Sequence, residues 1–443
     1  MAAIKVKQVS SRSVVEKKFN FNEELIAIKA PTFRKRALVH LAESKFPETT
    51  DEAWRRTDLR SFQPSQYTIS NRDGKVDLYA IPQDKFDSVV DDHFGGKVVV
   101  TTDGAFVDVD QSILDQGVIF TDMATAEAVY PELVEKILGK VVRSDESIFS
   151  AVAAAFGDHG VFVYIPRNVE VRQPLQSLFW AKGNDIAFIT NLVVYLDQNS
   201  SLTMVHESAS DENQKENIFS ANNVEIFVGD GAKLQFVELQ SWGNDVWNFS
   251  HERAKVATDG NLDWIFGSIG SKLTKNFSDL DLVGSGATGR MSGFYITDGK
   301  QHLDHDTQQN HFMPRTKSDL LFKGALLGHS RTVWQGMIYV APDAQKTDGY
   351  QANRNLILDE NARADSIPGL EILADDVRCT HGATVGSLEE EPIFYLKSRG
   401  IPQKEAERLV VEGFFDPIMQ RIPFEGVRER FKSAIMDKMD RNY

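Results

Sequence analysis

One cysteine, Cys379, is all that the 443-residue sequence contains, so no disulfide can form within the chain. Secreted domains commonly depend on disulfides, and their absence favours a reducing compartment. Long apolar runs are also missing: none approaches the roughly 20 residues needed to cross a bilayer, and the start Met1–Lys7 lacks the apolar core of a signal peptide. We therefore expect a cytoplasmic protein with no membrane partner.

An excess of positive charge is missing too. The 64 Asp and Glu residues outnumber the 49 Lys and Arg residues and give a net charge of −15. Such a field repels phosphate backbones, so we expect no nucleic-acid partner. Apolar residues still make up 42% of the chain, enough for a normal core, and the length allows two or three structural units.

Motifs of several enzyme classes are absent. The chain has no GxxxxGK[ST], GxSxG, HExxH or CxxC pattern, and Gly267–Lys272 has the wrong spacing for the first of them. We therefore expect that this chain binds no nucleotide and that any ATP hydrolysis behind its work occurs in another chain. The sequence favours a non-catalytic scaffold.

Residues 1–158 have a mixed, largely helical pattern. Phe33, Ala37 and Leu41 recur at helical spacing and predict an apolar stripe on a helix that Pro47 ends. The same section contains a hairpin pattern over 98–109 with Asp103-Gly104 as its turn, and helical patterns over 124–138 and 147–156.

Residues 159–386 change to short strand-like runs separated by turn residues. The turns recur about every 25 to 32 residues, apart from one interval of about 43 that predicts an insertion, at Asn199–Ser201, Asp230–Ala232, Asp259–Asn261, Gly284–Gly286, Leu327–His329 and Glu360–Ala362. A rough repeat of strands without intervening helices predicts a β-solenoid, in which each coil buries one face on its neighbours. A large β-sandwich is the alternative.

Residues 387–443 are helical. Ser387–Glu390 fits a capping box, and Gly400 with Pro402 predicts the end of one helix and the start of the next. A third amphipathic run places Val427, Phe431 and Ile435 on one face. This tail is too short for a large core, so it must pack on the solenoid or on a partner.

The segment from Gln301 to His311 holds three of the ten histidines. Its residue types suit a metal, but on a strand His302 and His305 point to opposite faces, which favours side-chain hydrogen bonds between coils. Asp298, Asp304 and Asp306 also fit the acids of a β-helical carbohydrate-active enzyme, although no positioned pair is evident.

Cys379 and His381 form a sharper constellation. They are two residues apart, so on a strand both point the same way, and a thiolate with an imidazole suits Zn or Fe. A closed site needs about four ligands, and the chain has no second thiol. Any metal here is shared with another subunit, or the pair is a buried thiol beside a hydrogen-bonded histidine.

One long segment is recognisable: Glu371–Gly386, EILADDVRCTHGATVG, which continues into Phe394–Ile401, FYLKSRGI. It closely resembles the C-terminal signature of the SufB/SufD family of iron–sulfur cluster assembly proteins. Gln301–His305 and Trp54–Asp58 are similar to further features of that family. His381 stands where the SufB branch has a Glu, so the SufD branch is the closer match.

The resemblance implies a right-handed parallel β-helix over 159–386, between an N-terminal helical domain (1–158) and a C-terminal helical domain (387–443). It implies two partners, SufB and the ABC-type ATPase SufC. His381 and Cys379 then become candidate ligands of a transient Fe or Fe–S cluster at the SufB interface, and we expect sulfur to arrive through SufB. SufC is expected to dock on apolar residues of the tail, namely Phe394, Tyr395, Leu396, Leu409, Phe414, Phe415 and Ile418.

Two other functions stay open. The chain is a stand-alone carbohydrate-active enzyme, or it only stabilises SufB without taking part in the metal site. Whether the isolated chain forms a homodimer is also left open by the sequence.

Overall fold

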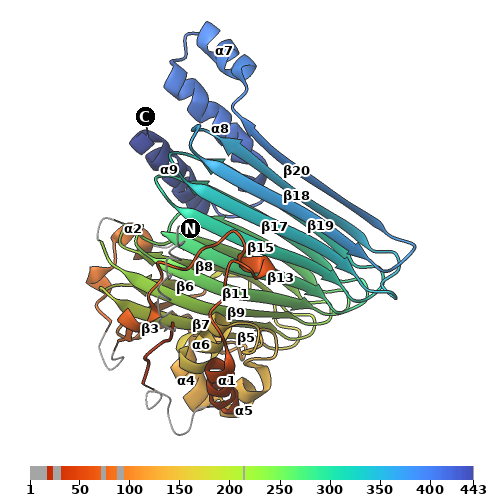
Figure 1. Cartoon of the computed structure of the whole chain (residues 1–443). Helices are drawn as coiled ribbons and strands as arrows, with labels where there is room; N and C mark the ends of the chain where they lie inside the picture. The colour runs from red at the N-terminus through yellow and green to blue at the C-terminus, as the bar shows by residue number, and fades with distance from the viewer. Residues whose placement is uncertain (1–16, 23–30, 71–75, 87–93, 213–214, 443) are drawn as a thin grey trace, which may run out of the picture.

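The computed structural model describes residues 17–22, 31–70, 76–86, 94–212 and 215–442. Two long, mostly parallel sheets face each other, and from β5 onward the chain alternates between them, so that each strand pairs with the strand two positions later (Figure 1). This pairing confirms the predicted β-solenoid and excludes the sandwich, whose strands are antiparallel.

Sheet A has the order β19-β17-β15-β13-β11-β9-β7-β5-β4, with β1 beside β7, and sheet B has the order β20-β18-β16-β14-β12-β10-β8-β6-β2-β3. The strands of sheet A are β1 (Thr68–Ile69), β4 (Ile119–Asp122), β5 (His159–Ile165), β7 (Ile186–Leu196), β9 (Ile218–Val228), β11 (Trp247–Val256), β13 (Leu273–Leu282), β15 (His302–His311), β17 (Arg331–Val340) and β19 (Arg363–Ile372). Those of sheet B are β2 (Gly96–Thr101), β3 (Ala105–Val109), β6 (Leu175–Ala181), β8 (Ser201–Ser210), β10 (Lys233–Ser241), β12 (Asn261–Ser268), β14 (Thr288–Thr297), β16 (Lys317–Leu326), β18 (Asp348–Ile357) and β20 (Arg378–Ser387).

The corner that leads from sheet A to sheet B holds a left-handed residue in every coil except the last, β19 to β20. These residues are Asn168, Asn199, Gly231, Asp259, Gly286, Arg315 and Lys346, with φ between 53° and 74°. Each donates its backbone N–H to a carbonyl of the next coil, as Asn199 does to Asp230 at 2.8 Å. A conformation that most side chains avoid is thus fixed by a ladder of hydrogen bonds between coils.

The predicted insertion is wrong. The first four predicted turns are corners from sheet A to sheet B, whereas Leu327–His329 and Glu360–Ala362 are corners from sheet B back to sheet A. The long interval contains an ordinary A-to-B corner at Phe312–Thr316, whose left-handed residue is Arg315 and not a usual turn former.

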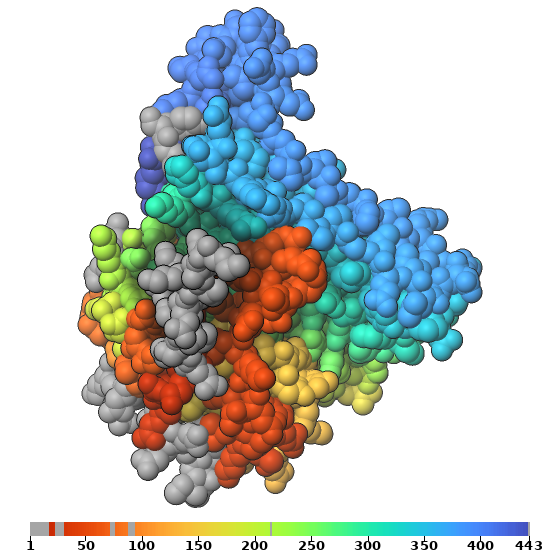
Figure 2. All heavy atoms as spheres, viewed as in Figure 1, coloured from red at the N-terminus to blue at the C-terminus, as the bar shows by residue number. Residues whose placement is uncertain are grey.

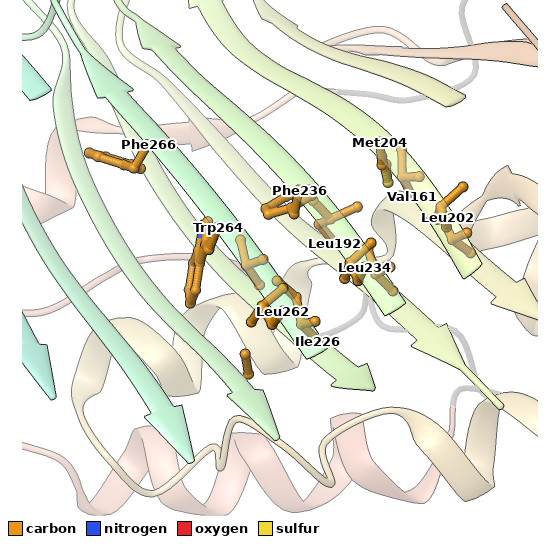
Figure 3. Close-up of a cluster of buried hydrophobic side chains, with 14 of the residues drawn as sticks. Val161, Leu192, Leu202, Met204, Ile226, Leu234, Phe236, Leu262, Trp264 and Phe266 are labelled. Atoms are coloured by element: carbon orange, nitrogen blue, oxygen red, sulfur yellow. The ribbon is translucent and has the colours of Figure 1, made fainter. Parts of the chain in front are cut away.

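Apolar side chains from both sheets fill the first coils between the sheets. Figure 3 shows Leu192 and Ile226 of sheet A together with Leu234, Leu262 and Trp264 of sheet B, and all five are at most 2% exposed. Because every coil buries the one below, this core is continuous along the solenoid axis.

The N-terminal section closes the first end of the solenoid. The predicted hairpin forms as β2 and β3, which extend sheet B, and α6 (Ile148–Phe156) is buried along its whole length against sheet A. The helix predicted over 124–138 is two helices, because Pro131 has no N–H to continue the first. The helices of this section are α1 (Thr32–Glu43), α2 (Gln83–Phe86), α3 (Gln111–Leu114), α4 (Met123–Val129), α5 (Pro131–Ile137) and α6.

The tail folds back on sheet B. It consists of α7 (Glu390–Ser398), α8 (Gln403–Met419) and α9 (Glu425–Asn442), and Val427, Phe431 and Ile435 of α9 are at most 1% exposed, as their spacing predicts. Gly267 makes room for this helix, since a Cβ there would lie 2.4 Å from the Phe431 ring. None of the described helices combines the length and apolarity needed to span a membrane.

The predicted capping box at Ser387 is wrong. Ser387 is the last residue of β20, where it pairs with Ile357 of β18, and the helix begins only at Glu390. Its N-cap residue, Glu389, makes no side-chain cap hydrogen bond within the described structure. Ser387 therefore belongs to a strand, although the local sequence pattern assigns it to the start of the helix.

The interior of the middle coils also contains buried polar side chains. Glu238 of β10 and Glu252 of β11 are both fully buried and share a hydrogen bond, and burial raises the pKa of each, that of Glu252 to about 7. Ser250 and Ser278 donate to Glu252 at 2.7 and 3.2 Å, and the Trp264 indole donates to Glu238 at 3.3 Å. This acid pair holds a proton in a place where ionising both carboxyls would be costly.

Raising the pH from about 6.5 to about 8 is expected to destabilise the fold through Glu252. In the unfolded chain this carboxyl ionises near its ordinary pKa of 4.5, whereas in the fold its pKa is about 7. The folded state therefore gives up a proton that the unfolded state has already lost, and the free energy of unfolding falls by on the order of 1 kcal/mol per pH unit below pH 7. The urea midpoint at each pH, compared with that of a variant that cannot ionise at this position, measures this fall.

Glu252→Gln is the matched variant, because glutamine keeps the shape and cannot ionise. We expect the urea midpoint of the natural chain to fall relative to that of Glu252→Gln over this pH range, and a constant difference between the two midpoints would contradict the assignment. The buried histidines act in the opposite direction: burial lowers the pKa of His206, His251 and His305 to about 3 and that of His302 and His311 to about 4, whereas in the unfolded chain they still hold part of their protons near pH 6.5. The natural chain and Glu252→Gln share this contribution, so the difference between their urea midpoints isolates that of Glu252.

Candidate functional site

The last coil of the solenoid, β19 and β20, is open at its far side. Within the described part of the chain each of these strands is hydrogen-bonded along one edge only, to β17 and to β18. Leu370, Ile372 and Val385 stand in the same columns as the buried Ile338, Val340 and Asn355 of the coil below, yet they are 37%, 37% and 48% exposed. The coil thus presents core-type side chains and free strand edges, which is an unfinished solenoid end.

Cys379 and His381 lie on this last coil, in β20. They pair with Gly349 and Gln351 of β18, so both side chains stand on the interior side, in register with residues that the coil below buries. Cys379 is half-buried beside Ile338 and Ala374, and burial raises the pKa of its thiol, while His381 is exposed. The strand register thus places both side chains on the same face, as their spacing predicts.

Two residues that the sequence did not single out for this site lie next to Cys379. A Cβ on Gly349 would lie 3.3 Å from the Cys379 sulfur and 3.4 Å from Nε2 of His311, so the glycine leaves the space between thiol and imidazole free. His311 is held from both sides, with Nδ1 2.7 Å from the Thr316 hydroxyl and Nε2 2.8 Å from that of Ser318. Gly349 and Cys379 are 30 residues apart in sequence, so only the pairing of neighbouring coils shows that they are in contact.

The histidine segment behaves mostly as the structural interpretation predicts. His302 and His305 point to opposite faces of β15: Nε2 of His302 lies 2.8 Å from the Thr57 hydroxyl, while His305 faces the interior. Neither ring nitrogen of His305 has a hydrogen-bond partner among the described residues, so the predicted hydrogen bonds do not form there. No group of three metal-ligating side chains occurs in the described residues.

The three acidic residues that fit a sugar hydrolase are buried or partly buried, and two of them form ion pairs. Asp304 is fully buried and pairs with the equally buried Lys275 at 2.9 Å, and Thr57 donates to it as well. Asp298 pairs with Lys438 of α9 at 2.8 Å, and Asp306 is largely buried. A polysaccharide cannot reach the buried Asp304, and the ion pair with Lys438 already engages Asp298, so these acids do not form the positioned pair of a sugar hydrolase.

The predicted docking residues of the tail separate into two groups. Phe394 and Tyr395 on α7 and Leu409 on α8 are 73%, 57% and 39% exposed, and Figures 1 and 2 show α7 with the start of α8 as a lobe that projects from the body. Leu396 and Phe414 are partly buried. Phe415 and Ile418 are at most 1% exposed and belong to the core between α8, α9 and sheet B.

Comparison with known proteins covers nearly the whole described chain. Residues 179–414 match the family model of the SufBD core domain of the SUF system for FeS cluster assembly, and residues 18–177 match that of the SufBD protein N-terminal region. The chain belongs to the SufBD family.

Individual members of the SufBD family agree with this assignment. The iron–sulfur cluster assembly protein SufD of Bacillus subtilis is 32% identical over 337 residues, which cover 76% of this chain and 77% of that protein. An iron–sulfur cluster assembly SufBD family protein of Staphylococcus saprophyticus is 30% identical over 319 residues, or 71% and 68% of the two chains, and a family member of Staphylococcus epidermidis is 29% identical over the same length.

Membership in the SufBD family shows in which system the open coil works. The chain is a subunit of the SUF system of iron–sulfur cluster assembly. The match to the SufBD core domain includes Cys379, His381 and α7. The match to the SufBD N-terminal region includes β2 to β4, which extend the two sheets.

Proposed function

We propose that this chain is a non-catalytic scaffold subunit that works in the cytoplasm together with SufB and the ATPase SufC. The open last coil pairs with SufB, and α7 with the start of α8 docks SufC. Cys379 and His381 supply one side of a site that holds iron or a nascent cluster for a short time. When the chain is alone, a second copy takes the place of SufB at the open coil.

The observation that carries the proposal is the unfinished end of the solenoid. Burying Leu370, Ile372 and Val385 needs a surface that is apolar and that offers backbone groups to two free strand edges. The end coil of a second solenoid has both properties. Because His381 lies in the same coil, a partner seated there contacts the candidate ligand directly.

The donor set of the open coil supports a metal site that is shared between two chains. Iron and zinc sites close with about four ligands, and this coil provides one thiolate and one exposed imidazole. The partner must supply the rest. A site divided between two chains opens when the interface opens, which gives a route for release of a finished cluster.

Docking of the ATPase rests on the projecting lobe. Phe394 and Tyr395 lie side by side on α7 with most of their surface exposed, and large aromatic residues in that state are typical of binding hot spots. The second half of α8 and all of α9 pack on sheet B, so movement of the lobe is transmitted to the solenoid. ATP-driven closure of a SufC dimer would then turn the paired solenoids and open their interface.

Co-expression with SufB and SufC tests the assembly. We expect all three chains to co-purify through a tag on this chain, and the mass of the assembly to include SufB. Purification of this chain without SufB, from cells that contain both, would contradict the proposal.

A further inference from the structure

Five interior side chains of sheet A form a polar column along the solenoid axis. The column, one residue per coil, consists of Ser250, Asn276, His305, Trp334 and Ser366. Neighbouring strands lie about 4.8 Å apart, so the column advances by that distance in each coil. This stretch of the column starts beside the acid pair Glu238–Glu252, with the polar Asn222 and Thr190 below it in the same register, and it ends on β19, the open edge of sheet A.

The first part of the column is fully hydrogen-bonded. Ser250 donates to Glu252 at 2.7 Å, Asn276 donates to Ser250 at 2.7 Å, and Asn276 also donates to Glu252. The proton of the acid pair is therefore in hydrogen-bond contact with the column at its inner end.

The outer part of the column has no partners. Neither nitrogen of His305, nor Nε1 of Trp334, nor the hydroxyl of Ser366 has a hydrogen bond to any residue that the structure describes. His305 and Trp334 are at most 1% exposed, so bulk solvent does not reach them. Unpaired polar atoms in a protein interior are rare and costly, and where they recur in a row an ordered water is their usual partner.

A residue beneath His381 continues the column toward sheet B. The side chain of Gln351, which is in register with His381, donates to the carbonyls of Gly336 and Gly369, while its Oε1 also lacks a partner in the described structure. A Cβ on Gly336 would lie 2.2 Å from the Trp334 ring and 2.6 Å from Oε1 of Gln351, so the two groups meet at this glycine. The unpaired atoms thus extend from His305 to the coil that carries His381.

We propose that water molecules bind along the interior from His305 to Gln351 and that they connect the buried acid pair to the open coil as a path for protons. Two observations independent of each other support it: the acid pair that holds a proton near neutral pH, and the row of buried polar atoms without protein partners.

The use of this path rests on the proposed function. A thiol binds iron only as thiolate, so formation of the sulfur–iron bond at Cys379 breaks the S–H bond and releases one proton. With a partner seated on the open coil, bulk water is excluded there. The proton then moves through the interior waters to the ionised carboxylate of the acid pair, and no electron is transferred.

Infrared spectroscopy of the whole chain without metal tests the path. The stretching band of the protonated carboxyl in the acid pair shifts when its proton is replaced by deuterium, and loss of the band in Glu252→Gln identifies it. After transfer into D₂O we expect rapid exchange in the natural chain. In His305→Phe, which keeps a ring and removes both nitrogens, we expect exchange at least about tenfold slower, because it then needs local opening of the solenoid.

Two further variants complete the test. Trp334→Phe removes only the indole N–H and is expected to slow exchange as well, whereas Phe322→Leu, which changes packing beside His305 without touching a polar atom, is expected to leave it unchanged. Exchange in both His305→Phe and Trp334→Phe as fast as in the natural chain would overturn the path. A high-resolution crystal structure with no water at either nitrogen of His305 would overturn the hydration, and neither result bears on partner binding.

Discussion

Lysine at Val385 or Leu370 is expected to abolish co-purification with SufB. In the isolated chain both side chains are exposed, so the charge costs the fold at most about 0.5 kcal/mol. In the paired state the same ammonium is buried in an apolar contact without a partner, at a cost of roughly 2–5 kcal/mol. The affinity then falls by about thirtyfold or more, which pull-down and analytical ultracentrifugation both detect.

The matched control is Val129→Lys, because Val129 is also an exposed valine, 59% accessible, but lies on α4 at the other end of the molecule. Co-purification with SufB should survive that change. If Val385→Lys behaves like Val129→Lys while its urea midpoint is unchanged, SufB does not bind at the open coil.

Aspartate at both Phe394 and Tyr395 is expected to remove SufC from the assembly and to leave SufB bound. The two rings are the most exposed aromatic pair of the tail, and truncating a hot-spot ring costs an interface about 2–4 kcal/mol. Two carboxylates add desolvation to that loss, so the ATPase should be undetectable after tag purification of the complex.

The structure shows which tail residues make a clean test. Phe415 and Ile418 belong to the chain's own core, and their replacement by aspartate would unfold the contact of α8 with sheet B before any docking is measured. Aspartate at Val39, an exposed position of α1, is a suitable control for added charge. Retention of SufC by the Phe394/Tyr395 variant would contradict docking on the lobe.

How far the sequence predicts the fold is clearest at the corners. Turn residues such as Asn199 and Gly231 indicate left-handed corners and hence the repeat, but Arg315 and Lys346 adopt the same backbone with no turn signature. There the conformation is imposed by hydrogen bonds to the next coil, as in the 2.8 Å bond from Arg315 to Gln345. A contact between coils is non-local, so a reading of local pattern placed an insertion where none exists.

The sequence also predicts only part of the candidate site. The common orientation of Cys379 and His381 follows from their spacing on one strand, which sequence contains. Gly349 and His311 belong to other strands, and only the register of β20 on β18 and the facing sheet bring them to the thiol. In the tail, helical spacing indicates an apolar face but not whether that face meets the chain's own sheet, as for Phe415, or a partner.

The polar column illustrates a third limit. Alternation along β15 and β17 predicts which side chains face inward, yet nothing in either strand alone shows that His305 and Trp334 continue a row of polar residues from Asn276. Within one strand, a polar interior residue is an isolated exception to the apolar pattern. Only the pairing of neighbouring strands shows that such residues form a row.

The proposal that this coil is a shared metal site is tested most directly by His381→Ala in the complex with SufB and SufC. We expect all three chains to co-purify still, because an exposed imidazole adds little to the interface. The amount of cluster formed per complex, followed by its visible absorbance and iron content, is expected to drop by about tenfold or more. Thr380→Ala, a change at the exposed neighbour that points the other way, should form clusters at the natural rate. A natural cluster yield from His381→Ala would contradict a shared metal site at the open coil and leave this chain as a stabiliser of SufB.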